Sequence, residues 1–360
     1  MVQYWYMKLF FDARYTRTDY YDGISRYGAS LIEALHENGE AVTMLICDKD
    51  QLKLLPKKVP YVLINSPLSP KELFVARTLN RLGADVVFSP MQWMGSIGRK
   101  YKLILTLQDI TYYQFPKPPT FLSLPVRIIW RLFHLAYWPQ RLLLKSADAV
   151  ATVSKTSRDY IVDYGLTKVP PTVIYNAPQA QTVTAQKTPG KDIVYMGSFM
   201  PYKNAEVLIE GMAYAPVGFT LHLISRITPE RKAELEALIP EGAKVVFHNG
   251  LSEADYQQLL SGAFALASGS RAEGFGLPIV EAATLGIPAL LSDLPIFHEV
   301  AGEGALYFDP DDPQSFAAKL DAMTRGDTRA HLSREATKHV TRFTWEKSVK
   351  VLADLAESLL

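Results

Sequence analysis

The stretch RAEGFGLPIVEAATLGIPALLSDLPIFHEV, Arg271–Val300, predicts a strand-to-helix turn and the strand that follows it. An apolar run at Ala263–Ala267 precedes the stretch and has the length of a buried strand. Two glycines then break the chain, and Pro278 suits the first helical turn, where a backbone N–H is not needed. Gly286 is placed to end the helix, and Pro288 opens the next strand. This pattern is typical of a parallel α/β sheet.

The start of this helix is a predicted diphosphate site. A helix N-terminus carries the equivalent of about +0.5 charge, and its N–H groups point at whatever anion lies there. The amides expected at this position belong to Gly274, Phe275, Gly276 and Leu277. Glu273 precedes the turn and Glu281 lies one turn into the helix. Carboxylates beside a phosphate site are suited to accepting hydrogen bonds from sugar hydroxyls.

Outward from this stretch, short apolar runs alternate with helical patterns along the whole chain, which predicts parallel sheets covered on both faces. The first series of expected strands is Lys8–Phe11, Ala41–Ile46, Tyr61–Ile64, Asp85–Ser89, Leu103–Leu107, Ala149–Val153 and Thr172–Ile174. The second series is Ile193–Met196, Thr220–Ile224, Lys244–Phe247, Ala263–Ala267, Ala289–Leu291 and Ala305–Phe308. Two of the helices expected between them are Tyr27–Glu37 and Ala205–Met212.

These elements predict an α/β protein of two Rossmann-like, doubly wound domains that face a central cleft. The length of 360 residues suits two domains. The expected boundaries are 1–178 for the first domain, 179–190 for a linker and 191–345 for the second domain. A final helix at 346–360 is expected to pack back on the first domain.

Four segments resemble family 4 of the retaining glycosyltransferases and occur along the chain in the family's order. EGFGLPIVE has the E-x7-E spacing of that family, and DARYTRTDYYDGISRYGASLIEAL is similar to its opening strand, glycine loop and helix. ADAVATVSKTSRDYI resembles the last strand and helix of the first domain, and IVYMGSFMPYKN resembles the first strand of the second. The likeness extends over nearly the whole chain, and it implies the GT-B fold, retention at the anomeric carbon and no essential metal.

The resemblance also implies roles for individual residues. Glu281 would bind the ribose hydroxyls of the nucleotide, Glu273 would contact the transferred sugar, and Lys203 would neutralise the diphosphate. Gly23 would belong to a loop that closes over the phosphates, and the amides of Gly274–Leu277 would hold sugar and phosphate oxygens.

The sequence departs from the family pattern at two places. Ser198 follows the glycine of the first second-domain strand, where many members have an arginine, so more of the phosphate charge falls to Lys203. Gln108 and Asp109 stand where a His-Asp pair is common. Glutamine can orient a hydroxyl group but cannot become a cation. The predicted catalytic residues are therefore Glu273, Lys203, Gln108 and Asp109.

The donor implied by the resemblance is a nucleotide-diphosphate sugar, with mannose from GDP-mannose preferred, and no further cofactor. The expected acceptor is a glycolipid, a lipid-linked glycan or a polysaccharide, with no nucleic acid as a partner. Two alternatives stay open: a UDP-sugar-dependent glucosyl- or N-acetylglucosaminyltransferase, and a nucleotide-sugar-binding protein without transfer activity. The missing histidine and arginine favour the second alternative, while the intact Glu273, Lys203 and Glu281 oppose it.

Composition and charge indicate a cytoplasmic enzyme, peripheral on the inner face of the cell membrane. The chain has one cysteine and no expected signal peptide. Residues 1–180 hold 22 Lys and Arg against 14 Asp and Glu, whereas residues 181–360 hold 16 against 23. The segment Phe121–Lys145 is expected to dock on an anionic membrane. Its basic residues, placed on one stripe of a helix kinked at Pro139, are Arg127, Arg131, His134, Arg141 and Lys145.

Overall fold

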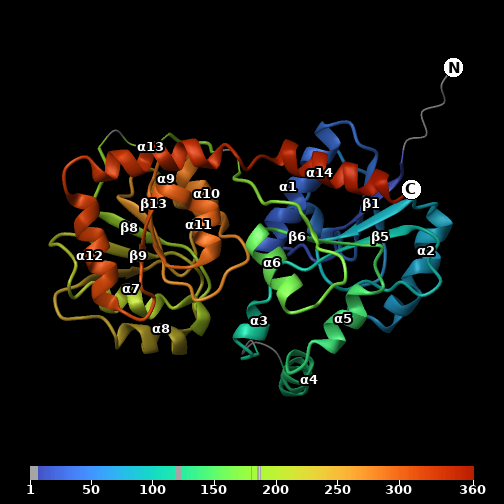
Figure 1. Ribbon diagram of the computed structural model, residues 1–360, viewed down its shortest axis with the longest axis horizontal. Helices are drawn as coiled ribbons and strands as arrows, with labels where there is room; N and C mark the ends of the chain where they lie inside the picture. The colour runs from blue at the N-terminus through green and yellow to red at the C-terminus, as the bar shows by residue number, and fades with distance from the viewer. Residues whose placement is uncertain (1–6, 119–122, 180, 185, 187) are drawn as a thin grey trace. The chain divides into compact units, whose positions relative to one another are not determined.

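The computed structural model describes residues 7–118, 123–179, 181–184, 186 and 188–360. It divides into two compact units (Figure 1). Unit 1 comprises Met1–Asn176 and Thr344–Leu360, and unit 2 comprises Ala177–Phe343. Each unit is built on one parallel sheet with helices on both faces.

Unit 1 has a 7-stranded sheet in the order β3-β2-β1-β4-β5-β6-β7, and every pair in it is parallel. The order places β1 beside both β2 and β4, so the strand order reverses there, which is the arrangement of doubly wound sheets. The strands are β1 (Leu9–Asp12), β2 (Val42–Ile46), β3 (Tyr61–Leu63), β4 (Val86–Ser89), β5 (Lys102–Thr106), β6 (Ala149–Thr152) and β7 (Thr172–Val173).

The helices of unit 1 include one from the far end of the chain. They are α1 (Gly23–Glu37), α2 (Val75–Leu82), α3 (Thr111–Gln114), α4 (Leu124–His134), α5 (Trp138–Leu144), α6 (Lys155–Asp163) and α14 (Trp345–Ser358), with short 3₁₀ turns η1 (Lys49–Lys53) and η2 (Pro70–Phe74). Helix α14 packs beside α1: the Trp345 and Tyr27 ring centroids lie 6.3 Å apart. The Ser348 hydroxyl also donates a hydrogen bond to the Tyr175 carbonyl at 2.7 Å.

Unit 2 has a 6-stranded parallel sheet in the order β10-β9-β8-β11-β12-β13. Its strands are β8 (Asp192–Tyr195), β9 (Thr220–Leu223), β10 (Lys244–Phe247), β11 (Ala265–Ser268), β12 (Ala289–Ser292) and β13 (Ala305–Phe308). Its helices are α7 (Ala205–Gly211), α8 (Pro229–Glu236), α9 (Glu253–Ser261), α10 (Leu277–Thr284), α11 (Pro295–Ala301), α12 (Pro313–Thr324) and α13 (Thr328–Val340), with 3₁₀ turns η3 (Pro201–Lys203) and η4 (Gly302–Gly304).

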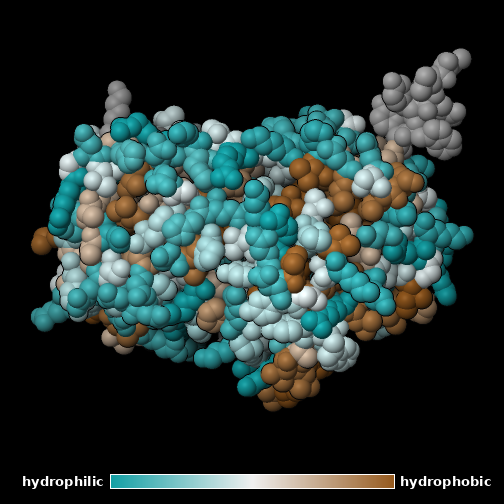
Figure 2. All heavy atoms as spheres, viewed as in Figure 1, coloured by the Kyte–Doolittle hydropathy of each residue, from teal (hydrophilic) through white to brown (hydrophobic). Residues whose placement is uncertain are grey.

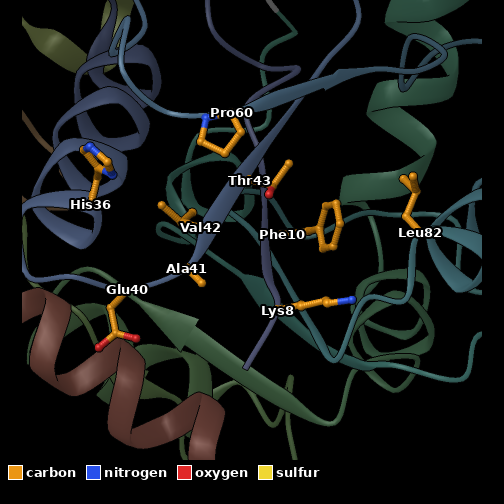
Figure 3. Close-up of a pocket in the computed structure, with 9 residues that line it drawn as sticks. All are labelled: Lys8, Phe10, His36, Glu40, Ala41, Val42, Thr43, Pro60 and Leu82. Atoms are coloured by element: carbon orange, nitrogen blue, oxygen red, sulfur yellow. The ribbon is translucent and has the colours of Figure 1, made fainter. Parts of the chain in front are cut away.

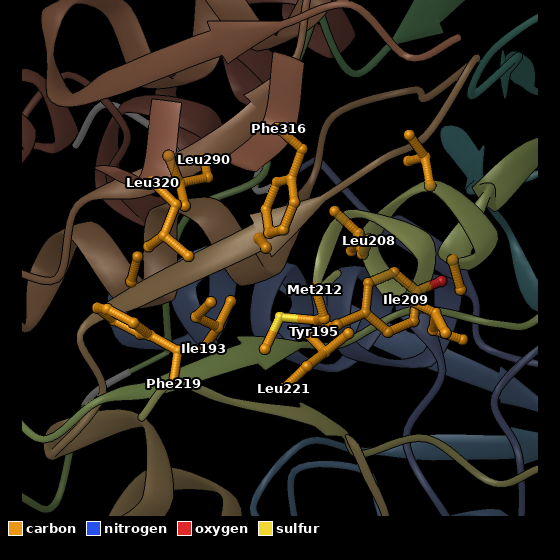
Figure 4. Packing of buried hydrophobic residues seen from close by; sticks show 14 of the residues in the cluster. Ile193, Tyr195, Leu208, Ile209, Met212, Phe219, Leu221, Leu290, Phe316 and Leu320 are labelled. Carbon is orange, nitrogen blue, oxygen red and sulfur yellow. The ribbon is translucent and has the colours of Figure 1, made fainter. Parts of the chain in front are cut away.

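The core of unit 2 fills the space between the sheet and the helices on one of its faces. Strands contribute Tyr195 and Leu221, and helices contribute Leu208, Phe316 and Leu320 (Figure 4). All five are almost fully buried, as expected of a closely packed interior. This packing fixes β8 and β11, whose carboxyl ends lead into the loops that carry the predicted site residues.

The structure confirms the predicted strands, each within two residues of its expected bounds. Two other expectations differ from what is observed. Within residues 179–190, interpreted from the sequence as the linker, Thr182 and Gln186 contact unit 2. Gln257 accepts hydrogen bonds from the Thr182 amide and hydroxyl, and the Gln186 amide donates to the Ser261 carbonyl. Unit 2 begins at Ala177.

The second difference concerns the segment 121–145, of which Phe121 and Leu122 lie outside the described residues. It forms two helices, α4 and α5, which are separated by Leu135–Tyr137. The break precedes Pro139, which occupies the first turn of α5, where its missing N–H costs nothing. The basic residues therefore do not share one helical stripe. Within the part of the chain that the structure describes, no helix is long and apolar enough to span a bilayer.

Candidate active site

The loop from β11 into α10 has the geometry of an anion site. Gly276 caps α10 with φ 97° and ψ 58°, a left-handed conformation that favours glycine. No side chain makes the N-terminal capping hydrogen bond of this helix, and Pro278 lies in its first turn without an N–H. The positive end of the helix therefore has no side-chain cap, which is the condition that the predicted anion site requires.

Asn204 holds this loop in place. Its side-chain amide donates hydrogen bonds to the Gly269 carbonyl at 3.0 Å and the Pro310 carbonyl at 2.8 Å. A Cβ at Gly269 would lie 2.6 Å from the Asn204 carbonyl oxygen, so only glycine fits. Asn204 itself has φ 49°, which asparagine tolerates better than most residues. The sequence reasoning missed Asn204, although an asparagine directly before a helical pattern is a signal of this kind.

The structure brings Lys203 and Glu273 into a direct ion pair. Their side chains are 15% and 21% exposed, so the pair is mostly shielded from water yet reachable by a ligand. The Lys203 ammonium also lies 5.4 Å from the centroid of the Tyr202 ring. An ammonium group has three N–H donors, and Glu273 uses one of them. Glu273 therefore orients the lysine while leaving it able to donate to a phosphate.

Glu281 lies in α10 and is only 2% exposed. The Tyr256 hydroxyl, from α9, donates a hydrogen bond to Glu281 Oε2 at 2.8 Å. Buried carboxylates need such partners, since an unpaired one would be costly. The sequence reasoning missed Tyr256, because nothing local in α9 marks it as the partner of a glutamate 25 positions away.

Tyr256→Phe is expected to weaken nucleotide-diphosphate binding about 5-fold, because Glu281 loses the hydrogen bond that orients its carboxylate and one such bond contributes on the order of 1 kcal/mol. Calorimetry with GDP measures the effect. Tyr214→Phe is the matched control, since Tyr214 is 57% exposed and should bind as wild type does. Unchanged affinity in the Tyr256 variant would mean that the orientation of Glu281 does not matter for the nucleotide.

The remaining unit 2 residue, Ser198, is exposed in the turn after β8. Its carbonyl accepts a hydrogen bond from the Tyr195 hydroxyl at 2.7 Å. A Cβ at Gly197 would approach that hydroxyl to 2.9 Å, so the turn needs glycine there. Burial, followed by the charge of Glu273, raises the pKa of Tyr195, which keeps its hydroxyl protonated as the donor. This turn is therefore fixed in shape beside the loop of Lys203.

Three predicted residues belong to unit 1. Gly23 is the first residue of α1, and a Cβ there would meet nothing within 4 Å, so packing does not explain the glycine. Gln108 and Asp109 follow β5. The Gln108 amide donates to the Pro90 carbonyl at 3.0 Å, and the Asp109 carboxylate accepts from the Thr111 amide at 2.8 Å. Gln108 is thus anchored to the loop after β4 by its amide nitrogen.

A buried charge network at the carboxyl end of β1 was not predicted. The Arg14 guanidinium contacts Asp12 Oδ1 at 2.7 Å and Glu72 Oε2 at 2.6 Å, and the three side chains are almost fully buried. Glu72 also accepts from the Gly95 amide at 3.0 Å. Burial lowers the pKa of Arg14, but the two carboxylates outweigh it and the net shift is upward. The network ties together the loops that follow β1, β3 and β4.

A shallow pocket of about 390 Å³ lies at the opposite, amino end of the unit 1 sheet (Figure 3). Lys8 and Glu40 line it together with apolar side chains of β1 and β2. Open α/β sheets bind ligands at the carboxyl ends of their strands, so this pocket is not the predicted site.

Comparison with known proteins agrees with this geometry. The family model described as glycosyl transferases group 1 matches residues 178–340, and that of Glycosyltransferase Family 4 matches residues 21–178. The O-antigen chain mannosyltransferase RfbU of Salmonella typhimurium is 26% identical over 316 residues, which cover 83% of this chain and 86% of that protein.

Solved structures of the same fold match nearly the whole chain. A sucrose-phosphate synthase from Thermosynechococcus elongatus superposes with a TM-score of 0.75 at 17% identity, covering 98% of this chain and 99% of that one. Anabaena HepE, solved in complex with UDP and glucose, gives 0.73 at 17% identity over 98% of this chain and 100% of that one. The two parallel-sheet domains and these neighbours confirm the GT-B fold.

Proposed function

Because the chain belongs to family 4 of the glycosyltransferases, we propose that it transfers mannose from GDP-mannose to a glycan, with retention at the anomeric carbon. The observation that carries the proposal is the Lys203–Glu273 pair beside the uncapped start of α10. A lysine and a helix N-terminus suit a diphosphate, and a carboxylate suits sugar hydroxyls. The likeness to an O-antigen chain mannosyltransferase supports mannose as the sugar and a glycan as the acceptor.

In this proposal each group acts on a different part of the donor. Lys203 and the amides of Gly276 and Leu277 hold the diphosphate, Glu273 accepts hydrogen bonds from the mannose hydroxyls, and Glu281 accepts from the ribose. With Ser198 at the position of the family's second phosphate cation, Lys203 is the principal side chain that neutralises the leaving group. No metal is required, because the lysine and the helix dipole supply the positive charge.

The proposed reaction needs no side-chain base. The bond between the anomeric carbon and the β-phosphate oxygen breaks, and the acceptor hydroxyl oxygen bonds to the same face of that carbon. The acceptor proton passes to the departing phosphate oxygen, so GDP leaves protonated at that oxygen and the configuration is kept. Lys203 stabilises the negative charge that develops there, which is the main contribution of such preorganised groups.

A thermal-shift panel of GDP, UDP, GDP-mannose, UDP-glucose and UDP-N-acetylglucosamine tests the donor, with and without EDTA. A ligand at 100 times its dissociation constant stabilises the folded state by about 2.7 kcal/mol. GDP and GDP-mannose should each raise the melting temperature, and EDTA should not change the size of either shift. Stabilisation by the UDP ligands alone would favour a UDP-sugar transferase, and loss of the GDP effect in EDTA would contradict metal independence.

Gln108→Ala is expected to reduce turnover about 10-fold, with little change in the Kd of GDP, because removing one hydrogen bond costs on the order of 1 kcal/mol. The Gln108 side-chain amide also donates a hydrogen bond to the Pro90 carbonyl. The substitution therefore removes the proposed sugar contact and also loosens the loops that follow β5 and β4. Gln108→His retains an N–H donor and should keep more activity. Wild-type turnover in the alanine variant would remove Gln108 from the site. A protein that binds GDP-mannose but neither transfers nor hydrolyses it would instead be a binding protein.

A further inference from the structure

Helix α4 exposes an apolar face that the rest of the unit does not cover. None of its residues is buried, and Ile128, Ile129 and Leu132 are 54%, 68% and 61% exposed. Leu124 and Leu135, four residues before Ile128 and three after Leu132, are each 67% exposed and continue the same face. Figure 2 shows brown, hydrophobic spheres gathered over α4, at the lower edge of unit 1. Five large apolar side chains therefore share one exposed face of a single helix.

The opposite side of α4 anchors the helix to the unit. The Trp130 ring lies 4.9 Å from that of Tyr112, and the His134 ring lies 5.1 Å from that of Tyr113. Burial lowers the pKa of His134, so it stays neutral at pH 7 and donates from Nδ1 to the Trp130 carbonyl at 2.8 Å. The helix is therefore held through aromatic side chains, with its apolar side directed outward.

We propose that α4 lies in the surface of an anionic bilayer, with this apolar face among the acyl chains and the basic residues beside it at the headgroups. The sequence has no Asp or Glu from Ile110 to Ala147. Arg131 and Lys145 are exposed on α4 and at the end of α5, and Trp138 is 65% exposed between them. Apolar, tryptophan and cationic side chains on adjoining surfaces are the composition of interfacial helices.

The apolar face matters more here than a basic stripe. The Arg141 guanidinium, expected to face lipid, instead donates to the Gly165 carbonyl at 2.7 Å and the Tyr164 carbonyl at 3.0 Å.

The size of the apolar face indicates what covers it. Helix α4 has 11 residues and so is about 16 Å long and about 10 Å wide. One such face offers on the order of 200 Å², far below the ~800 Å² per partner of a stable protein interface. A bilayer is therefore a better occupant than a second copy of the chain.

Vesicle co-sedimentation of the full chain tests this proposal, with phosphatidylcholine vesicles that contain or lack phosphatidylglycerol. Wild type should bind the anionic vesicles, and the double substitution Ile129→Asp with Leu132→Asp should weaken binding by at least about 10-fold, since two exposed apolar side chains lose their burial. Leu68→Asp is the matched control, because Leu68 is 95% exposed on the same unit and away from α4. It should bind as wild type does.

A second double substitution tests the contribution of the basic residues beside the apolar face. Arg131→Glu with Lys145→Glu should weaken binding about 10-fold at 0.1 M salt and less at 1 M, because the Debye length falls from ~10 Å to ~3 Å. Unchanged melting temperatures show that the variants are folded. Because this control does not use GDP, it tests the membrane proposal separately from the transferase proposal, on which the membrane proposal does not rest.

Three results would overturn the proposal. The first is wild type that does not co-sediment with anionic vesicles, and the second is an Ile129→Asp, Leu132→Asp variant that binds them as tightly as wild type. The third is a concentration-dependent dimer in sedimentation velocity that the same variant abolishes, which would make a second copy the occupant. The fluorescence of the exposed Trp138 provides a second readout, and its emission should shift to the blue when wild type meets anionic vesicles.

Discussion

Lys203→Ala should lower the turnover of GDP-mannose about 100- to 1,000-fold, the loss typical of removing one preorganised donor to a developing negative charge. Lys203 is the principal side-chain cation proposed at the leaving group, and no arginine stands at Ser198 to replace it. Binding of GDP should weaken about 10- to 100-fold, because a charge-assisted hydrogen bond contributes about 1.5–3 kcal/mol. Binding of guanosine, which has no phosphate, should not change. Calorimetry with both ligands separates these effects.

Two further variants separate the role of Lys203 from that of Glu273 and from a general loss of positive charge. Glu273→Gln keeps an acceptor for the Lys203 ammonium and should retain GDP affinity while it lowers turnover through the sugar contact. Lys232→Ala is the matched control, since the Lys232 side chain is 42% exposed on α8 and forms an ion pair there with Glu236. Equal GDP affinity in wild type and the Lys203 variant would place the diphosphate elsewhere.

Arg14→Ala should destabilise unit 1 by about 3–5 kcal/mol, because Asp12 and Glu72 would remain buried without their cation. The loops after β1, β3 and β4 should loosen together, since Glu72 also holds the Gly95 amide. Hydrogen exchange followed by mass spectrometry measures the loss of protection peptide by peptide, which suits a chain of two units better than one melting temperature does.

Arg17→Ala provides the comparison for this prediction. Arg17 pairs with Asp22, but its side chain is 50% exposed, so its loss should cost about 0–1 kcal/mol. If the Arg14 and Arg17 variants were equally stable, the Arg14 network would contribute nothing measurable to the fold. In that case the loops after β1 and β4 would have to be held by their other contacts.

The sequence was sufficient to predict the two parallel sheets because most of their strands are buried on both faces. Runs such as Leu9–Phe11 and Leu103–Leu105 have no polar alternation, which leaves a parallel strand covered by helices as the simplest interpretation. The turn at Gly276 could also be predicted from local sequence. A left-handed conformation favours glycine, and the first helical turn tolerates the missing N–H of Pro278. The GT-B fold itself was implied by the resemblance to family 4, and the two parallel sheets and the solved neighbours confirm it.

Long-range pairing could not be predicted in the same way. The Tyr256–Glu281 hydrogen bond and the Arg14–Glu72 ion pair join residues 25 and 58 positions apart, and no local pattern selects either partner. The direction of α4 was also missed. The sequence showed basic residues at helical spacing, but which side of the helix meets the protein depends on the aromatic rings of Tyr112 and Tyr113.

The anomeric configuration of the transferred sugar is the most direct test of the proposed reaction. Wild type and the Lys203→Ala variant would be incubated with GDP-mannose and a panel of lipid-linked and free oligosaccharides, and the product examined by NMR. Wild type should attach mannose with the α configuration of the donor, and the variant should form little product. A β-linked product would contradict retention, and transfer from a UDP-sugar in place of GDP-mannose would contradict the proposed donor.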